Sequence, residues 1–182
     1  MPAWSARADG PANTHCRLVG QPSQAVGQRS APSRDRGTRA RRVAVEIVSL
    51  ETLPLFNPDL ESPPPQAVTA FRGRVAAADA LIIASPEYAH GVSGVMKNAL
   101  DWLVSCEAFA AMPVAVLNAA PRAHHADAAL REILSTMSAQ VVEKASVTIP
   151  LPNAAPCRPT IKEMLTDALA ALIAATRRTN SP

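Results

Sequence analysis

Apolar positions from residue 43 onward fall into short continuous runs separated by stretches with helical spacing. The runs at 80–84 and 114–117 are apolar at every position, as expected for strands that are buried on both faces of a parallel sheet. The run at 43–48 is rich in β-branched residues and is also predicted as a strand. A further strand is expected within 141–151.

Between these strands the apolar positions repeat at helical spacing. Helices are predicted around 68–75, 94–105, 126–137 and 161–173. Ser93 is expected to cap the second of them. Thr160 and Glu163 predict a capping box at the start of the last, which should end near Arg177 and Arg178. Alternating strands and helices indicate an α/β fold, a three-layer sandwich with a parallel sheet between helices.

The first 42 residues have a different character. Ala, Arg, Gly, Pro and Ser supply 27 of them, and the longest apolar cluster is Leu18-Val19. Such a segment buries too little surface to offset its conformational entropy, so residues 1–42 are predicted to be disordered and residues 43–178 to form the domain. The segment holds eight basic and two acidic residues, a charge of +6, which leaves −3 for the remainder. The folded part therefore offers no basic face for nucleic acid.

Overall composition excludes two further classes. The longest nearly apolar stretch, 108–117, is half the length of about 20 residues that a spanning helix needs, so no membrane partner is expected. The three cysteines, Cys16, Cys106 and Cys157, are odd in number and widely spaced. This favours a reducing, cytoplasmic location without disulfides or a cysteine metal site. Aromatic residues make up only 3%, so the core should consist mainly of Ala, Val, Leu and Ile.

Candidate chemistry lies in two loops that follow predicted strands, at the sheet edge where open parallel sheets bind ligands. One loop spans 85–94 and the other 118–125. The first carries a dense motif that continues onto the following helix. Its members are Pro86-Glu87-Tyr88, Gly94, Lys97-Asn98 and Asp101-Trp102.

This motif resembles that of the NADPH-dependent FMN reductase family, flavodoxin-like proteins that include quinone, azo-dye and chromate reductases. The resemblance extends from about Val43 to Thr176 and includes the 53–59 link. Family members commonly have Asn at the position of Ala89 and Pro at that of Ser93. The first difference is expected to remove a side-chain hydrogen bond to the flavin.

The resemblance implies a set of cofactor-binding residues and a reaction. The residues expected to bind FMN are Pro86, Glu87, Tyr88, Ala89, His90, Gly91, Asn118 and Ala119. Hydride would pass from NADPH or NADH to FMN and then to a small-molecule acceptor such as a flavin or quinone. No catalytic side chain and no metal are assigned, because the cofactor carries the chemistry. A homodimer or homotetramer is expected.

Several of these residues also allow structural roles. Tyr88 fits a subunit interface as well as the flavin, and Trp102 fits the core or an interface. Lys97 and Asn98 are favoured as a pair that hydrogen-bonds the helix to the sheet rather than as catalytic residues. Glu87 is favoured as a residue that orients the loop or pairs across a dimer. The adjacent His124 and His125 are expected in a solvated loop, and Cys106 as an inert thiol.

The family's first strand and its Gly-Ser-x-Arg-x-x-Ser phosphate loop are not recognisable before Val43. The fragments 17–20 and 30–34 are rejected as phosphate loops, since neither follows a predicted strand. Residues 1–42 are therefore interpreted either as a divergent tail or as a misread reading frame, and weak FMN retention is expected. The rival functions are a non-catalytic remnant without a phosphate site and a nucleic-acid binder that acts through the Arg-rich segment.

Overall fold

The structure, a computed structural model, describes residues 14–20, 43–118, 124–149 and 158–179. The main sheet contains β1 (Thr14–Gly20), β2 (Val43–Val48), β3 (Ala80–Ala84), β6 (Pro113–Asn118), β7 (Gln140–Val141) and β8 (Val147–Thr148). A separate hairpin consists of β4 (Glu87–Tyr88) and β5 (Gly91–Val92). The helices are α1 (Gln66–Ala76), α2 (Gly94–Asp101), α3 (His124–Thr136) and α4 (Arg158–Thr179), with short 3-10 turns η1 (Pro58–Leu60), η2 (Glu107–Phe109) and η3 (Glu143–Ala145).

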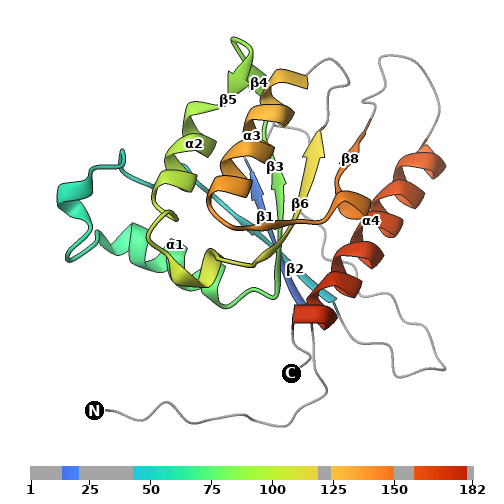
Figure 1. The fold of residues 1–182 in the computed structure, drawn as a ribbon, viewed down its shortest axis with the longest axis horizontal. Helices are drawn as coiled ribbons and strands as arrows, with labels where there is room; N and C mark the ends of the chain where they lie inside the picture. The colour runs from blue at the N-terminus through green and yellow to red at the C-terminus, as the bar shows by residue number, and fades with distance from the viewer. Residues whose placement is uncertain (1–13, 21–42, 119–123, 150–157, 180–182) are drawn as a thin grey trace, which may run out of the picture.

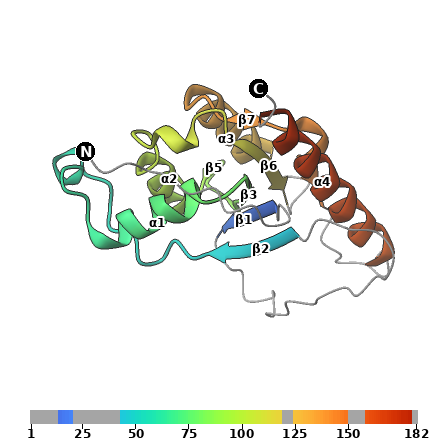
Figure 2. The ribbon, with the colours of Figure 1, turned by 90° about the horizontal axis from the view of Figure 1, so that it is seen from below.

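The strands of the main sheet are all parallel and lie in the order β2-β1-β3-β6-β7, with β8 also paired to β6 (Figure 1). Alternate residues of a strand face opposite sides. Leu81 and Ile83 of β3 pack in the larger core, which includes the buried residues of α1, α2 and α3. Ala80 packs in a smaller core with Leu172 of α4. Helix α4 therefore covers the opposite face, and Figure 2 shows α1, α2 and α3 together on the other side of the strands. The predicted α/β three-layer fold is confirmed.

The prediction that the first strand is missing is wrong. Thr14–Gly20 form β1, which lies between β2 and β3 and pairs with both, Thr14 opposite Val43 and Cys16 opposite Ala80. The sequence Thr-His-Cys-Arg-Leu-Val-Gly has no continuous apolar run, so its pattern did not indicate a strand. Pairing on both sides supplies the backbone hydrogen bonds instead. The rest of the segment that was predicted to be disordered, residues 1–13 and 21–42, lies outside the described residues, as does the fragment 30–34.

The helices agree with their predicted positions except at some ends. Ser93 caps α2 as predicted, because its Oγ accepts a hydrogen bond from Met96 N at 3.3 Å. This helix ends at Asp101 rather than at Ser105. Helix α4 begins at Arg158, so Thr160 is its third residue and the predicted capping box is wrong. The chain has Pro159 in the first turn, a position that suits proline.

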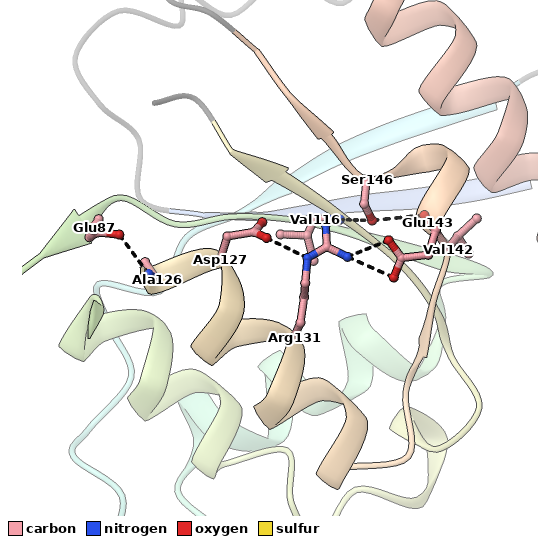
Figure 3. Close-up of polar contacts among 8 residues, drawn as sticks. All are labelled: Glu87, Val116, Ala126, Asp127, Arg131, Val142, Glu143 and Ser146. Atoms are coloured by element: carbon pink, nitrogen blue, oxygen red, sulfur yellow. Dashed lines mark hydrogen bonds and ion pairs between the residues drawn. The ribbon is translucent and has the colours of Figure 1, made fainter. Parts of the chain in front are cut away.

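The strand predicted within 141–151 is interrupted. Between β7 and β8 lies η3, and Ala145 at its end is fully buried. The Ser146 hydroxyl accepts a hydrogen bond from Val116 N at 3.0 Å and donates one to Val142 O at 3.0 Å (Figure 3). A side chain thus takes the place of a backbone partner for β6, which is why the pairing of β6 passes from β7 to β8.

Candidate functional site

The candidate site is built on the hairpin that follows β3. Glu87 pairs with Val92 and Tyr88 with Gly91, and the turn between them consists of Ala89 and His90. Both turn residues have positive φ, 48° and 59°, as a type I′ hairpin turn requires. A side chain in the left-handed region costs about 1–2 kcal/mol per residue, and Asn and Gly tolerate it best. The family's preference for Asn at position 89 therefore has a backbone reason.

The base of the hairpin is attached to α2 through two serines. Ser85 Oγ lies 3.4 Å from Ser93 Oγ, and Ser93 N donates to Ser85 Oγ at 3.5 Å. Ser93 is buried, with 3% of its surface exposed, and also caps α2. The start of the hairpin and the start of α2 therefore share one polar contact.

Glu87 connects the hairpin to a second helix. Its Oε2 accepts a hydrogen bond from Ala126 N at 2.9 Å, in the first turn of α3 (Figure 3). This hydrogen bond, followed by the nearby His125 and His90 side chains, holds the pKa of Glu87 below its ordinary value. Glu87 is therefore ionised at neutral pH, and its Oε2 accepts a hydrogen bond from α3. This geometry supports the interpretation of Glu87 as a residue that orients the loop.

Three imidazoles lie together beside this contact. His90 stacks on His125 with ring centroids 4.5 Å apart, and His124 lies 4.1 Å from His125. His124 and His125 are exposed, but they are the first residues of α3, so the predicted loop is wrong there. The stack was missed because His90 and His125 are far apart in sequence and meet only when the hairpin reaches α3. Within the described ranges, no group of three or more His, Cys, Asp or Glu side chains is arranged to hold a metal ion.

The predicted cofactor-binding residues gather at one edge of the sheet. Ala84 of β3 is in register with Gly20 of β1 and with Leu117 of β6, so these three strands end together. Asn118 follows at the end of β6, 8% exposed, and its backbone O accepts from Ile149 N at 2.7 Å. Pro86, Glu87 and Gly91 are half-buried, whereas Tyr88, Ala89 and His90 are exposed, Tyr88 at 63%. Ala119 lies outside the described residues.

These residues suit the ring of a flavin. The hairpin carries the flat rings of Pro86, Tyr88 and His90, the last stacked on His125, beside a short stretch of backbone polar groups. Asn118 stands at the end of the neighbouring strand β6. Flavin and nucleotide sites combine such flat surfaces with a few polar groups. The end of β1 at Gly20 lies at the same edge, where open parallel sheets bind their ligands.

The second half of the motif attaches the 53–60 link, which is the predicted 53–59 link extended to the end of η1, to α2. Asn98 Oδ1 accepts from Phe56 N at 2.7 Å, and Asn98 Nδ2 donates to Pro54 O at 2.9 Å. Trp102 Nε1 donates to the same carbonyl at 2.8 Å, and its fully buried ring meets Phe56 edge-on. Lys97 pairs with Asp101 one turn along the helix. The buried ring of Trp102 agrees with its favoured role in the core. Lys97 and Asn98 both form hydrogen bonds, but to Asp101 and to the 53–60 link rather than to the sheet as predicted.

Two arginines, neither of which stood out in the sequence, organise the surroundings. Arg72 of α1 donates from Nε to Trp102 O at 2.7 Å and from Nη2 to Glu61 and Ser105. Arg131 of α3 donates to Asp127 at 2.7 Å and to Glu143 at 2.8 Å (Figure 3). The i, i+4 spacing of Asp127 and Arg131 could have indicated their pair from sequence. None of the described helices is long and apolar enough to cross a membrane.

Comparisons with known proteins bear on this site. The sequence profile of the NADPH-dependent FMN reductase family matches residues 26–153, well over half of the chain. An NAD(P)H-dependent FMN reductase of Pseudomonas aeruginosa is 39% identical over 80 residues, 42% of this chain and 43% of the relative. An NADPH:quinone oxidoreductase of Arabidopsis thaliana is 47% identical over 60 residues, 32% of this chain and 31% of the relative. The chain thus spans less than half the length of these curated relatives.

Solved structures share the fold at low sequence identity. An oxidoreductase from Corynebacterium diphtheriae has a TM-score of 0.64 and 21% identity, covering 91% of this chain and 98% of its own. The flavoenzyme FerB, an NAD(P)H:(acceptor) oxidoreductase from Paracoccus denitrificans, has a TM-score of 0.61, 20% identity and the same coverage. The strand order, the hairpin motif and the profile match agree, and the chain belongs to the NADPH-dependent FMN reductase family.

Proposed function

We propose that this chain binds FMN and uses it to pass hydride from NADPH or NADH to a small-molecule acceptor. The observation that carries the proposal is the convergence of the Pro86–Gly91 hairpin and Asn118 at the ends of two neighbouring strands, in a chain of this family. When bound, FMN supplies the redox chemistry, which makes a protein acid or base unnecessary. The ionised, hydrogen-bonded state of Glu87 agrees with such a site.

The residues of the hairpin bind and orient the ring in this proposal. Pro86 restricts the backbone where the chain leaves β3, so the polar groups that follow stand at defined angles. Exposed Tyr88 and His90 offer flat surfaces to the flavin or the incoming acceptor, and Asn118 provides an amide from β6.

We propose quinones as the acceptor class and a homodimer or homotetramer as the assembly. Relatives named as quinone reductases support the first, including one from Pseudomonas putida that is 35% identical over 85 residues. The second proposal is supported by Tyr88, whose exposed side chain fits a role at a subunit interface. The three widely spaced cysteines favour a reducing compartment, so we propose a cytoplasmic location.

The test is FMN titration of the full chain, followed by NADPH and NADH oxidation with a benzoquinone as acceptor. Tyr88→Ala should weaken FMN binding or raise the acceptor KM, whereas Leu55→Ala is a matched control, because Leu55 is 83% exposed and lies in the 53–60 link. Absence of FMN binding together with absence of quinone-dependent oxidation would refute the proposal and favour a non-catalytic remnant. Light scattering of the same preparation measures the assembly.

A further inference from the structure

The hairpin of the candidate site is held against α3 at two points. The Glu87 carboxylate accepts a hydrogen bond from Ala126 N at 2.9 Å (Figure 3). On the same side, the His90 ring stacks on the His125 ring at 4.5 Å and an interplanar angle of 20°. Both points join the hairpin to the first residues of one helix.

The hairpin has little stability of its own. Each of its strands is two residues long, and they form a sheet separate from the main one. Two-stranded hairpins are marginal without packing against another element. Ala89 and His90 also have positive φ, a conformation that persists only where neighbouring structure imposes it. Helix α3 contacts both β4 and β5, so its contacts, together with the Ser85–Ser93 contact at the base, hold the hairpin in place.

A carboxylate suits the contact with α3 better than a neutral acceptor. The N-terminus of a helix presents unpaired N–H groups and a partial positive charge, both of which favour an anion. Hydrogen bonds to an ionised acceptor are also shorter and stronger than neutral ones. A glutamine at position 87 would keep an acceptor oxygen but lose the charge, so it separates the hydrogen bond from the electrostatic effect.

We propose that Glu87 is a positioning residue for the flavin ring, which it places indirectly by docking the Pro86–Val92 hairpin onto the N-terminus of α3, with the His90–His125 stack as the second point of attachment. The inference rests on the proposed function, because the residues of this hairpin are those proposed to line the ring. Glu87 acts through the backbone that it holds and takes no part in hydride transfer.

The experiment compares Glu87→Ala, Glu87→Gln and His90→Ala with Glu132→Ala, an exposed control on α3. Amide hydrogen exchange of residues 87–92 is measured on the full chain without FMN. FMN affinity and the midpoint potential of bound FMN are measured on the loaded protein. Glu87→Ala should speed exchange in the hairpin, raise the Kd for FMN about tenfold and shift the potential. Glu87→Gln should remain within about threefold of the original Kd, and His90→Ala should fall between them.

Each outcome decides the matter. Unchanged exchange in Glu87→Ala overturns the docking role, even if the chain binds no FMN, so that failure is distinct from failure of the proposed function. Faster exchange with unchanged Kd and potential overturns the positioning role. If Glu87→Ala does not fold, Glu87→Gln and His90→Ala still test the proposal, because both must change hairpin exchange more than Glu132→Ala does.

Discussion

Replacing Asn98 by Ala should destabilise the fold although Asn98 lies outside the large hydrophobic core. Its side chain accepts from Phe56 N at 2.7 Å and donates to Pro54 O at 2.9 Å, and both contacts are part-buried. The 53–60 link therefore depends on Asn98 for its attachment to α2. In Asn98→Ala the N–H of Phe56 loses its partner, whereas Pro54 O keeps its bond from Trp102 Nε1.

The size of the effect follows from these contacts. Two hydrogen bonds contribute about 1 kcal/mol each, and an unpaired, part-buried N–H adds a penalty of about 1–2 kcal/mol. Alanine returns roughly 0.5 kcal/mol through its higher helix propensity. The free energy of unfolding should therefore fall by about 2.5–3.5 kcal/mol, which corresponds to a drop of about 5–14 °C in Tm for a chain of this size.

Urea unfolding followed by circular dichroism measures this loss, with Asn98→Asp as the matched control. Aspartate keeps an acceptor for Phe56 N but cannot donate to Pro54 O, so its cost should be intermediate. Trp102→Phe removes the other donor to Pro54 O, and the double variant with Asn98→Ala should lose about 1 kcal/mol more than the sum of the two. A loss below about 0.5 kcal/mol for Asn98→Ala, or additive effects of the two substitutions, would show that Asn98 does not hold the 53–60 link against α2.

Three further predictions concern other parts of the fold. Leu134→Ala should lower the free energy of unfolding, measured in urea, by about 2–5 kcal/mol, since Leu134 is fully buried. Leu165→Ala should lower it less, because Leu165 is 39% exposed. Ala89→Asn should raise Tm by a few degrees, because asparagine tolerates φ of 48°, and an unchanged or lower Tm would contradict this. The hydrogen bond from the Ser105 hydroxyl is the main reason that the pKa of Glu61 lies below its ordinary 4.5. The ionised Glu61 carboxylate therefore stabilises the fold above pH 4.5, and this stabilisation is lost as the pH falls through the lowered pKa. In thermal melts, Glu61→Gln should reduce the fall of Tm at acid pH. An unchanged dependence of Tm on pH would contradict this prediction.

The clearest parts of the fold could be predicted from sequence because their residues carry the signal locally. The strands β2 and β3 have the predicted bounds, and β6 extends the predicted run by one residue at each end. Their apolar and β-branched runs suit a sheet that is covered on both faces. The periodic helices α3 and α4 were equally plain, since their buried positions repeat at helical spacing.

The candidate site was predictable only as a motif. The sequence indicates which residues follow β3 and β6, and a parallel sheet brings those two strand ends to one edge. It does not indicate that Glu87 turns toward α3 or that His90 meets His125, because these contacts depend on the direction in which the hairpin leaves the sheet. Nothing in the sequence around Pro54 and Phe56 likewise indicates that their hydrogen-bonding partner is Asn98, more than forty positions away.

By itself the sequence determined the α/β class, the helices and strands with strong periodicity, and the family motif on the strand-loop-helix. The tertiary structure alone decided that Thr14–Gly20 is a strand, that η3 interrupts the last strand and that Glu87 bonds to the first turn of α3. The difference has one physical cause. The spacing of apolar residues along the chain indicates which elements are buried. The strand β1 and the position of the hairpin depend instead on hydrogen bonds that distant segments supply.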